Sequence, residues 1–223
     1  MTRRVTLTVA LIAAAVVAGC AGPRAATGEP PNLYPHKLEI RAYVDSGQYL
    51  RDIAAVAGQA AEWLERRAAQ RKSGERLAVV FDLDETLFFN WPYLSRNDFG
   101  YIRAEWDRWV EDANAPPIEP VREVYRKARQ LGVDVILITG RTERYRAATE
   151  RNVRAIGCGE FVALVCKPEG ASGTSAAFKT AARERFTQEG WTIVANLGDQ
   201  ASDLSGGFAE RTFKLPNPFY LSE

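Results

Sequence analysis

The chain has little histidine and little cysteine. Among its 223 residues there is one histidine, His36, and there are three cysteines. A catalytic triad with a histidine base and a metal site built from several histidines are therefore excluded. The net charge is also small, with 29 basic against 28 acidic residues, so the charge gives no sign of a nucleic-acid partner. Any catalysis must depend on carboxylates, lysine, arginine or hydroxyl groups.

The longest apolar run lies near the start of the chain. It covers residues 5–17, follows Arg3 and Arg4, and is too short to cross a bilayer comfortably. It ends in the sequence Val-Ala-Gly-Cys, and this order resembles a bacterial lipoprotein signal peptide over residues 1–19, with lipidation at Cys20. The alternative is an ordinary signal peptide that contains a cysteine by chance.

A lipid anchor at Cys20 implies a membrane-attached protein outside the cytoplasm. We expect a periplasmic or cell-surface location. In a Gram-negative cell we expect the outer membrane, because Ala21 stands where inner-membrane lipoproteins have aspartate. Residues 20–36 are rich in proline, glycine and alanine, which predicts a flexible tether.

Two further cysteines, Cys158 and Cys166, would lie in an oxidising compartment. If residues 161–166 form a straight strand, Cys166 lies about 16 Å from the start of that strand, at ~3.3 Å per residue. A disulfide needs Cα atoms within about 7 Å of each other. We expect two buried, unpaired thiols rather than a bridge.

Helix-like and strand-like segments alternate along the rest of the chain. Residues 37–75 are helix-rich, with a break near Ser46 and Gly47. The expected strands are 77–83, 133–138, 161–166, 191–197 and 212–215, and the expected helices between them are 120–131, 142–156 and 175–189. This alternation predicts one α/β domain over residues 37–223 with a Rossmann-like parallel sheet.

The interval 88–118 departs from this rhythm and is dense in aromatic residues. It follows the first strand directly, at the end of the sheet where ligands bind in such folds. We expect a small helical cap. Trp91 and Tyr93 are candidates to line the pocket, whereas Trp106 and Trp109, three residues apart on a predicted helix, are expected in the core of the cap.

Polar residues stand at the carboxyl ends of the strands or on the helices that follow. They are Asp82 and Asp84, Thr139 with Gly140 and Arg141, Lys179, and Asp199 with Asp203. Asp82 and Asp84 share a face in extended backbone, so both carboxylates converge on one pocket if the strand runs that far. Carboxylates this close require a cation or a raised pKa, and oxygen ligands without histidine or cysteine favour Mg²⁺. Lys167 is an alternative to Lys179, because it too follows a strand.

The segment from Val80 to Tyr93, VFDLDETLFFNWPY, resembles the first motif of class C acid phosphatases. These are bacterial lipoprotein phosphatases of the haloacid dehalogenase-like superfamily, with plant storage proteins as relatives. The four aspartates Asp82, Asp84, Asp199 and Asp203 match the pattern of the family, and the ending from Arg211 to Pro218 is similar as well. Gly140 departs from the bacterial class, which usually has asparagine there, although some plant relatives carry glycine.

The resemblance implies an Mg²⁺-dependent acid phosphatase acting on phosphomonoesters. It implies that Asp82 and Asp199 bind the metal through side chains and Asp84 through its backbone carbonyl. Asp203 would support the metal or orient Lys179, and a plain helix cap is the alternative for this residue.

The same resemblance implies a covalent mechanism. Asp82 would be the nucleophile that forms an aspartyl-phosphate, and Asp84 would protonate the leaving group and later activate water. Asp84 must be neutral in the first step, which predicts an acidic pH optimum. Thr139 and the Gly140 amide would hold phosphoryl oxygens, and Lys179 would offset their charge. Arg141 either reaches the substrate or packs the loop expected after the strand 133–138.

The identity of the substrate is open at this point. Nucleoside monophosphates are a hypothesis, because aromatic side chains of the cap can stack on a base. The rival readings are a phosphotransferase on the same scaffold and a non-catalytic storage or binding lipoprotein. The presence of Asp82 speaks against the non-catalytic reading.

Overall fold

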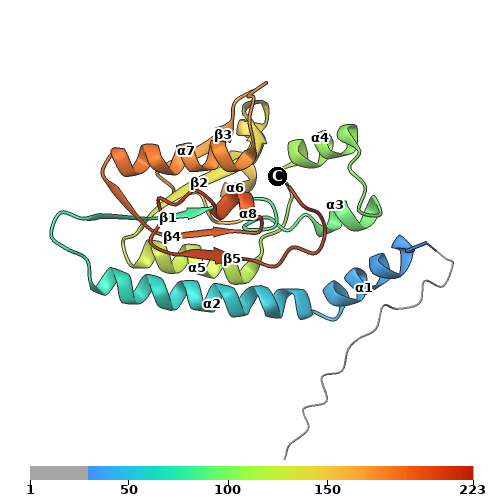
Figure 1. The fold of residues 1–223 in the computed structure, drawn as a ribbon, viewed down its shortest axis with the longest axis horizontal. Coiled ribbons are helices and arrows are strands. Elements are labelled where there is room, and N and C mark those ends of the chain that lie inside the picture. The colour runs from blue at the N-terminus through green and yellow to red at the C-terminus, as the bar shows by residue number, and fades with distance from the viewer. Residues whose placement is uncertain (1–29, 223) are drawn as a thin grey trace, which may run out of the picture. The chain divides into compact units, whose positions relative to one another are not determined.

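Five parallel strands form the central sheet of the protein. The computed structural model describes residues 30–222, and Leu33–Glu223 form one compact unit. The strand order is β3-β2-β1-β4-β5 (Figure 1), with β1 at the centre. The strands are β1 (Arg76–Phe81), β2 (Asp134–Thr142), β3 (Ala163–Lys167), β4 (Trp191–Gly198) and β5 (Thr212–Lys214). The predicted α/β fold with a parallel sheet is confirmed.

Helices pack on both faces of this sheet. They are α1 (Leu33–Asp45), α2 (Gln48–Ala69), α3 (Trp91–Arg96), α4 (Arg103–Asp112), α5 (Glu119–Gln130), α6 (Arg146–Ala155), α7 (Ser175–Gln188) and α8 (Ala201–Leu204), with a 3-10 turn η1 (Glu143–Tyr145) before α6. Helices α2 and α5 lie against one face and α7 lies against the other (Figure 1). The break between α1 and α2 falls at Gly47, whose φ of 74° lies in the left-handed region that glycine adopts without strain.

The apolar residues of β1 alternate between the two faces. Leu77, Val79 and Phe81 belong to the large core shared with α2 and α5. Ala78 and Val80 belong to the smaller core under α7. Because side chains of a strand point to opposite faces in turn, a central strand covered on both sides reads as a continuous apolar run. This burial fixes the register of β1 and therefore the position of the residues that follow it.

The boundaries of all five strands differ by at least one residue from the expectation, and the differences at the ends of β1 and β2 lie at the site. β1 ends at Phe81 rather than at residue 83, so Asp84 lies in a turn. β2 runs on through Thr142, with an irregular pairing between Thr139 and Thr142 against β3. Thr139, Gly140 and Arg141, here called the second motif, therefore lie at the end of a strand and not in the loop after it, and the helix expected from residue 142 begins only at Arg146.

The expected cap and thiols are present, and the N-terminal predictions lie mostly outside the described residues. Interval 88–118 holds α3 and α4. Cys158 and Cys166 are buried and unpaired. Helix α1 begins at Leu33, earlier than the expected end of the tether at residue 36. The predicted signal peptide 1–19 and the predicted lipidation site Cys20 fall outside the range 30–222. Within that range no helix is long and apolar enough to span a bilayer.

Candidate active site

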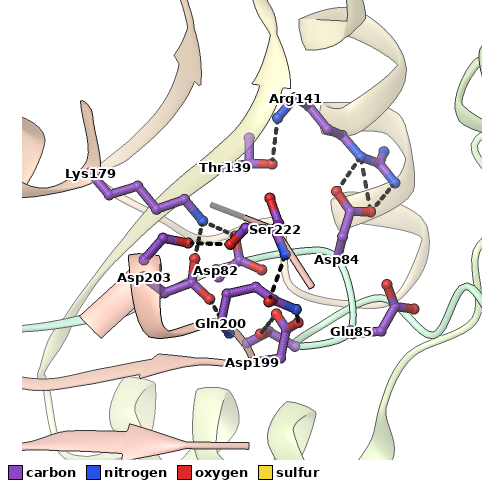
Figure 2. A network of polar contacts seen from close by, with 12 residues as sticks. Asp82, Asp84, Glu85, Thr139, Arg141, Lys179, Asp199, Gln200, Asp203 and Ser222 are labelled. Atoms are coloured by element: carbon purple, nitrogen blue, oxygen red, sulfur yellow. Dashed lines mark hydrogen bonds and ion pairs between the residues drawn. The ribbon is translucent and has the colours of Figure 1, made fainter. Parts of the chain in front are cut away.

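A cavity of about 520 Å³ opens at the carboxyl ends of β1, β2 and β4. Its floor is acidic, and its outer wall comes from the cap and from the C-terminal residues. Figure 2 shows the polar groups of the floor, which converge from segments far apart in the sequence. The parallel register explains this convergence, because β1 and β4 end side by side with Phe81 opposite Leu197.

Asp82 lies at the centre of the floor, paired with a buried lysine. Its backbone N–H donates to the carbonyl of Leu197 at 3.0 Å, which extends the β1–β4 pairing by one residue. The Lys179 ammonium, from α7, donates to the carboxylate of Asp82 and to Oδ1 of Asp203, the latter at 2.6 Å (Figure 2). All three side chains are at least nine-tenths buried. Lys179 therefore contacts both an aspartate that follows β1 and an aspartate that follows β4.

Burial by itself raises the pKa of Asp82 and lowers the pKa of Lys179. Burial raises the pKa of Asp82 well above its usual range, and Lys179 only partly offsets this effect. Burial also acts to lower the pKa of Lys179, but the attraction of Asp82 and Asp203 outweighs it, so the pKa is raised. The lysine is thus held as a cation. Perturbed pairs of this kind are typical of functional sites.

Three aspartates can hold a metal ion. Asp82, Asp199 and Asp203 each offer an oxygen, and these oxygens all lie within 4.8 Å of one another. When ionised they carry three negative charges, which Lys179 reduces to two. A divalent cation with a preference for oxygen ligands matches both the donor set and this charge. Asp203 also accepts from the Gln200 backbone N–H at 2.8 Å, so it caps α8 as well as orienting Lys179.

Asp84 does not share the cluster with Asp82. β1 ends at Phe81 and the chain turns between Leu83 and Phe88, and within this turn the carboxylate of Asp84 pairs with Arg141 instead (Figure 2). The Arg141 Nη2 and Nε atoms lie 2.6 and 3.0 Å from the two carboxylate oxygens, and Asn90 Nδ2 donates to Oδ1 at 2.9 Å. Both carboxylates line the one cavity, as expected, but they pair with different cations, Asp82 with Lys179 and Asp84 with Arg141. Arg141 packs the second motif against the first.

Glu85 is a buried carboxyl that was not predicted from the sequence as a site residue. It is fully buried with φ of 55°, and it accepts from the Asn90 backbone N–H at 2.9 Å and from the Tyr220 hydroxyl. Burial, together with the nearby charges of Asp84 and Asp199, raises its pKa to about 8. The sequence signal was only its place beside Asp84, because nothing in the pattern distinguishes a buried glutamate from an exposed one.

The remaining phosphate-site candidates lie at the end of β2. Thr139 is buried, and its hydroxyl accepts from the Arg141 backbone N–H at 3.1 Å. Gly140 lines the cavity, with open space where a side chain would stand. Lys167 also lines the cavity, but its ammonium donates to the Gly173 carbonyl at 3.5 Å. The geometry thus places Lys179, not Lys167, beside Asp82.

The aromatic wall differs from the expectation at two positions. Tyr93 lines the cavity as expected, but Trp91 does not: its ring packs against Phe99 at 5.8 Å and Phe219 at 5.4 Å. Trp106, expected in the core of the cap, lines the cavity and stacks edge-on against Tyr93. Side chains three residues apart on a helix share a face, but only the docking of α4 decides what that face meets.

The C-terminal residues complete the site, although no pattern in the sequence predicted a role for them. Tyr220, Leu221 and Ser222 line the cavity. Asn217 donates to the Asp199 carboxylate at 2.7 Å. Burial raises the pKa of Asp199, and the hydrogen bonds from Asn217 and Gln200 oppose that rise.

Comparison with known proteins identifies the family. A model of the HAD superfamily, subfamily IIIB (acid phosphatase), matches residues 9–223. Acid phosphatase 1 of Solanum lycopersicum is 34% identical over 186 residues, covering 81% of this chain and 72% of that protein. The stem 28 kDa glycoprotein of Glycine max is 35% identical over 187 residues, with the same two shares. The chain belongs to HAD subfamily IIIB, the acid phosphatases.

The fold agrees with this acid phosphatase family. The class C acid phosphatase of Bacillus anthracis superposes with a TM-score of 0.66 at 20% identity, covering 84% of each chain. The resemblance to class C acid phosphatases and their plant relatives is therefore confirmed. HAD phosphatases use a divalent metal, and the buried aspartate cluster of this acid phosphatase has the donors to bind one.

Proposed function

We propose that this acid phosphatase hydrolyses phosphomonoesters with Mg²⁺ and through an aspartyl-phosphate on Asp82. The observation that carries the proposal is the contact of Asp82 with Lys179 at the floor of a cavity, inside a cluster of three buried aspartates. A phosphomonoester is a dianion, so this floor admits it only if a divalent cation balances the carboxylates. The bound ion would supply charge neutralisation for the phosphoryl group.

The residues of the chain then have distinct tasks. A carboxylate oxygen of Asp82 forms a bond to phosphorus while the bond from phosphorus to the leaving oxygen breaks. Asp84 gives its proton to that oxygen, and later takes a proton from the water that cleaves the aspartyl-phosphate and releases inorganic phosphate. Since Asp84 is paired with Arg141 in the structure, this pair must open for the acid role. Thr139, Gly140 and Lys179 would hold the phosphoryl oxygens.

For the substrate we propose nucleoside monophosphates. The outer wall of the cavity presents aromatic rings from the cap, among them Tyr93, Tyr101 and Trp106. Aromatic rings stack on the faces of nucleobases. The Tyr101→Ala variant should raise KM for a nucleoside monophosphate more than KM for a small aryl phosphate. Trp91→Ala is the matched control, because Trp91 lies outside the cavity. An equal rise for both substrates would contradict stacking.

We also propose that the protein is a lipoprotein anchored through Cys20, in the periplasm or at the cell surface. The support is the order of charged, apolar and small residues that ends at Cys20. Cys20→Ser should abolish radiolabelled palmitate incorporation and release the protein from the membrane fraction. Continued labelling would refute lipidation at this residue.

Phosphate release tests the central proposal. Protein that lacks residues 1–20 is assayed on a phosphomonoester at several pH values, with Mg²⁺ and with EDTA. Activity should depend on the metal, and Asp82→Asn should reduce it by at least 1,000-fold, because an amide is not a nucleophile. Asp45→Asn, exposed at the end of α1, is the control for loss of an aspartate. Activity that survives in Asp82→Asn would overturn the mechanism.

The same assay separates the rival readings. Added glycerol or nucleoside yields a transphosphorylated product if the protein is a phosphotransferase. A complete lack of phosphate release with Mg²⁺ present would favour the storage or binding protein. Trapping of labelled phosphate on acid-quenched wild type, absent in Asp82→Asn, would identify the intermediate.

A further inference from the structure

Two side-chain amides converge on a single oxygen of Asp199. Asn217 Nδ2 lies 2.7 Å from Asp199 Oδ2, and Gln200 Nε2 lies 2.6 Å from the same atom. A carboxylate oxygen has two lone pairs, so two N–H donors saturate Oδ2. Oδ1 has a single contact, with the Thr86 hydroxyl at 3.3 Å. It is thus the oxygen that is left to bind an ion.

The C-terminal backbone fixes the direction of both amides. The Phe219 N–H donates to Asn217 Oδ1 at 2.8 Å, and the Ser222 N–H donates to Gln200 Oε1 at 3.0 Å. Because each oxygen accepts from a backbone donor, each NH₂ group must point the other way, toward Asp199. Figure 2 shows Gln200 between Ser222 and Asp199 in this arrangement. The last residues of the chain therefore orient a side chain of the aspartate cluster.

We propose that Asn217 and Gln200 are positioning residues of the metal centre, held in place by the C-terminal segment 217–222. They hold Asp199 so that Oδ1 is left for the ion, and the segment orients Asp199 through these two amides. The proposal rests on the proposed function, because it assumes that the aspartate cluster binds Mg²⁺. Partners of this kind commonly change metal affinity by 10- to 100-fold when they are removed.

The C-terminal segment also has an ordinary structural role, which the test must separate. Phe219 is buried and its ring lies 5.2 Å from that of Tyr49. Loss of the segment would therefore lower stability whether or not it serves the metal. A purely structural role would leave the metal dissociation constant of the folded protein unchanged.

The experiment measures Mg²⁺ binding by isothermal titration calorimetry on the full chain in detergent, alongside thermal unfolding without metal. Asn217→Ala and Gln200→Ala should each raise the Mg²⁺ dissociation constant by about tenfold or more. Asn152→Ala is the matched control: this buried asparagine makes two hydrogen bonds to Ala115, away from the cavity. It should lower the melting temperature and leave the Mg²⁺ dissociation constant within twofold of wild type.

Truncation after Leu221 tests the backbone part of the proposal without altering Asn217 or Gln200. It removes the Ser222 N–H, so it should weaken Mg²⁺ binding in the same direction as Gln200→Ala, and the combined variant should lose little more. Wild-type affinity in Asn217→Ala and Gln200→Ala would overturn the proposal. Failure of the wild type to bind Mg²⁺ would instead refute the metal part of the proposed function.

Discussion

The buried Glu85 should make the stability of the protein depend on pH. Its pKa is raised from 4.5 to about 8 in the folded protein, with burial as the main cause. Between these two values the folded protein holds one proton more than the unfolded chain. The free energy of unfolding should therefore fall by about 1.4 kcal/mol for each pH unit. The contribution of Glu85 is complete below about pH 4.5 and is lost as the pH rises to about 8.

The expected change is large enough to measure. From pH 5.5 to 7.5 one proton contributes about 3 kcal/mol, which corresponds to roughly 5–10 °C in melting temperature for a domain of this size. Glu85→Gln cannot ionise, and its side-chain carbonyl still accepts from the Asn90 backbone N–H. The variant should therefore lose this part of the slope. Thermal and urea unfolding are followed by circular dichroism in EDTA, so that metal binding does not contribute.

The test compares how steeply the free energy of unfolding changes with pH in the wild type and in Glu85→Gln. Asp82 and Asp199 are also buried and add to the pH dependence of both proteins, so only the difference between wild type and Glu85→Gln is informative. Glu62→Gln removes a carboxylate whose side chain is 70% exposed on α2, and its curve should run parallel to that of the wild type. If Glu85→Gln is also parallel, Glu85 is ionised in the folded protein and the argument from burial fails.

Three further predictions concern the floor of the cavity and the core. Lys179→Met leaves two buried carboxylates without their cation, so kcat for phosphate release should fall by at least about 100-fold, while wild-type kcat would contradict its electrostatic role. Cys158 and Cys166, whose pKa values burial raises to about 12 and about 11, should react with a thiol reagent only after unfolding in guanidinium, and rapid labelling of folded protein would contradict this. Gly198→Ala would place its Cβ 2.4 Å from that of Asp203 and should lower the free energy of unfolding by about 1–3 kcal/mol in urea titrations, whereas unchanged stability would show that Asp203 moves freely.

Burial on both faces explains why the strands could be predicted. The run from Leu77 to Phe81 has no polar residue, and such a run is typical of a central parallel strand. Glycines after helical segments, such as Gly132 and Gly190, marked where helices end, and both have positive φ. Local patterns of this kind depend on neighbouring residues alone, so the order of elements followed from the sequence.

The partners of the side chains in the cavity could not all be predicted from the sequence. Asp82 could be named because it stands in a recognisable motif, and Lys179 because it lies on a predicted helix that follows a strand. The partner of Asp84, by contrast, depends on where β1 stops and on the extension of β2 through Arg141. Trp91 and Trp106 exchanged their expected places because the docking of α3 and α4 decides which ring faces the cavity.

The sequence by itself determined the parallel α/β fold, the family and the aspartates at the strand ends, because periodicity and short motifs are local properties of the chain. Only the tertiary structure decided the pairing of Asp84 with Arg141, the burial of Glu85 and the attachment of Asn217 to Asp199. Asp84 and Arg141 are 57 residues apart in the sequence, and Asp199 and Asn217 are 18 residues apart. The energies of these contacts depend on burial and direction, which exist only once the strands and helices have packed together.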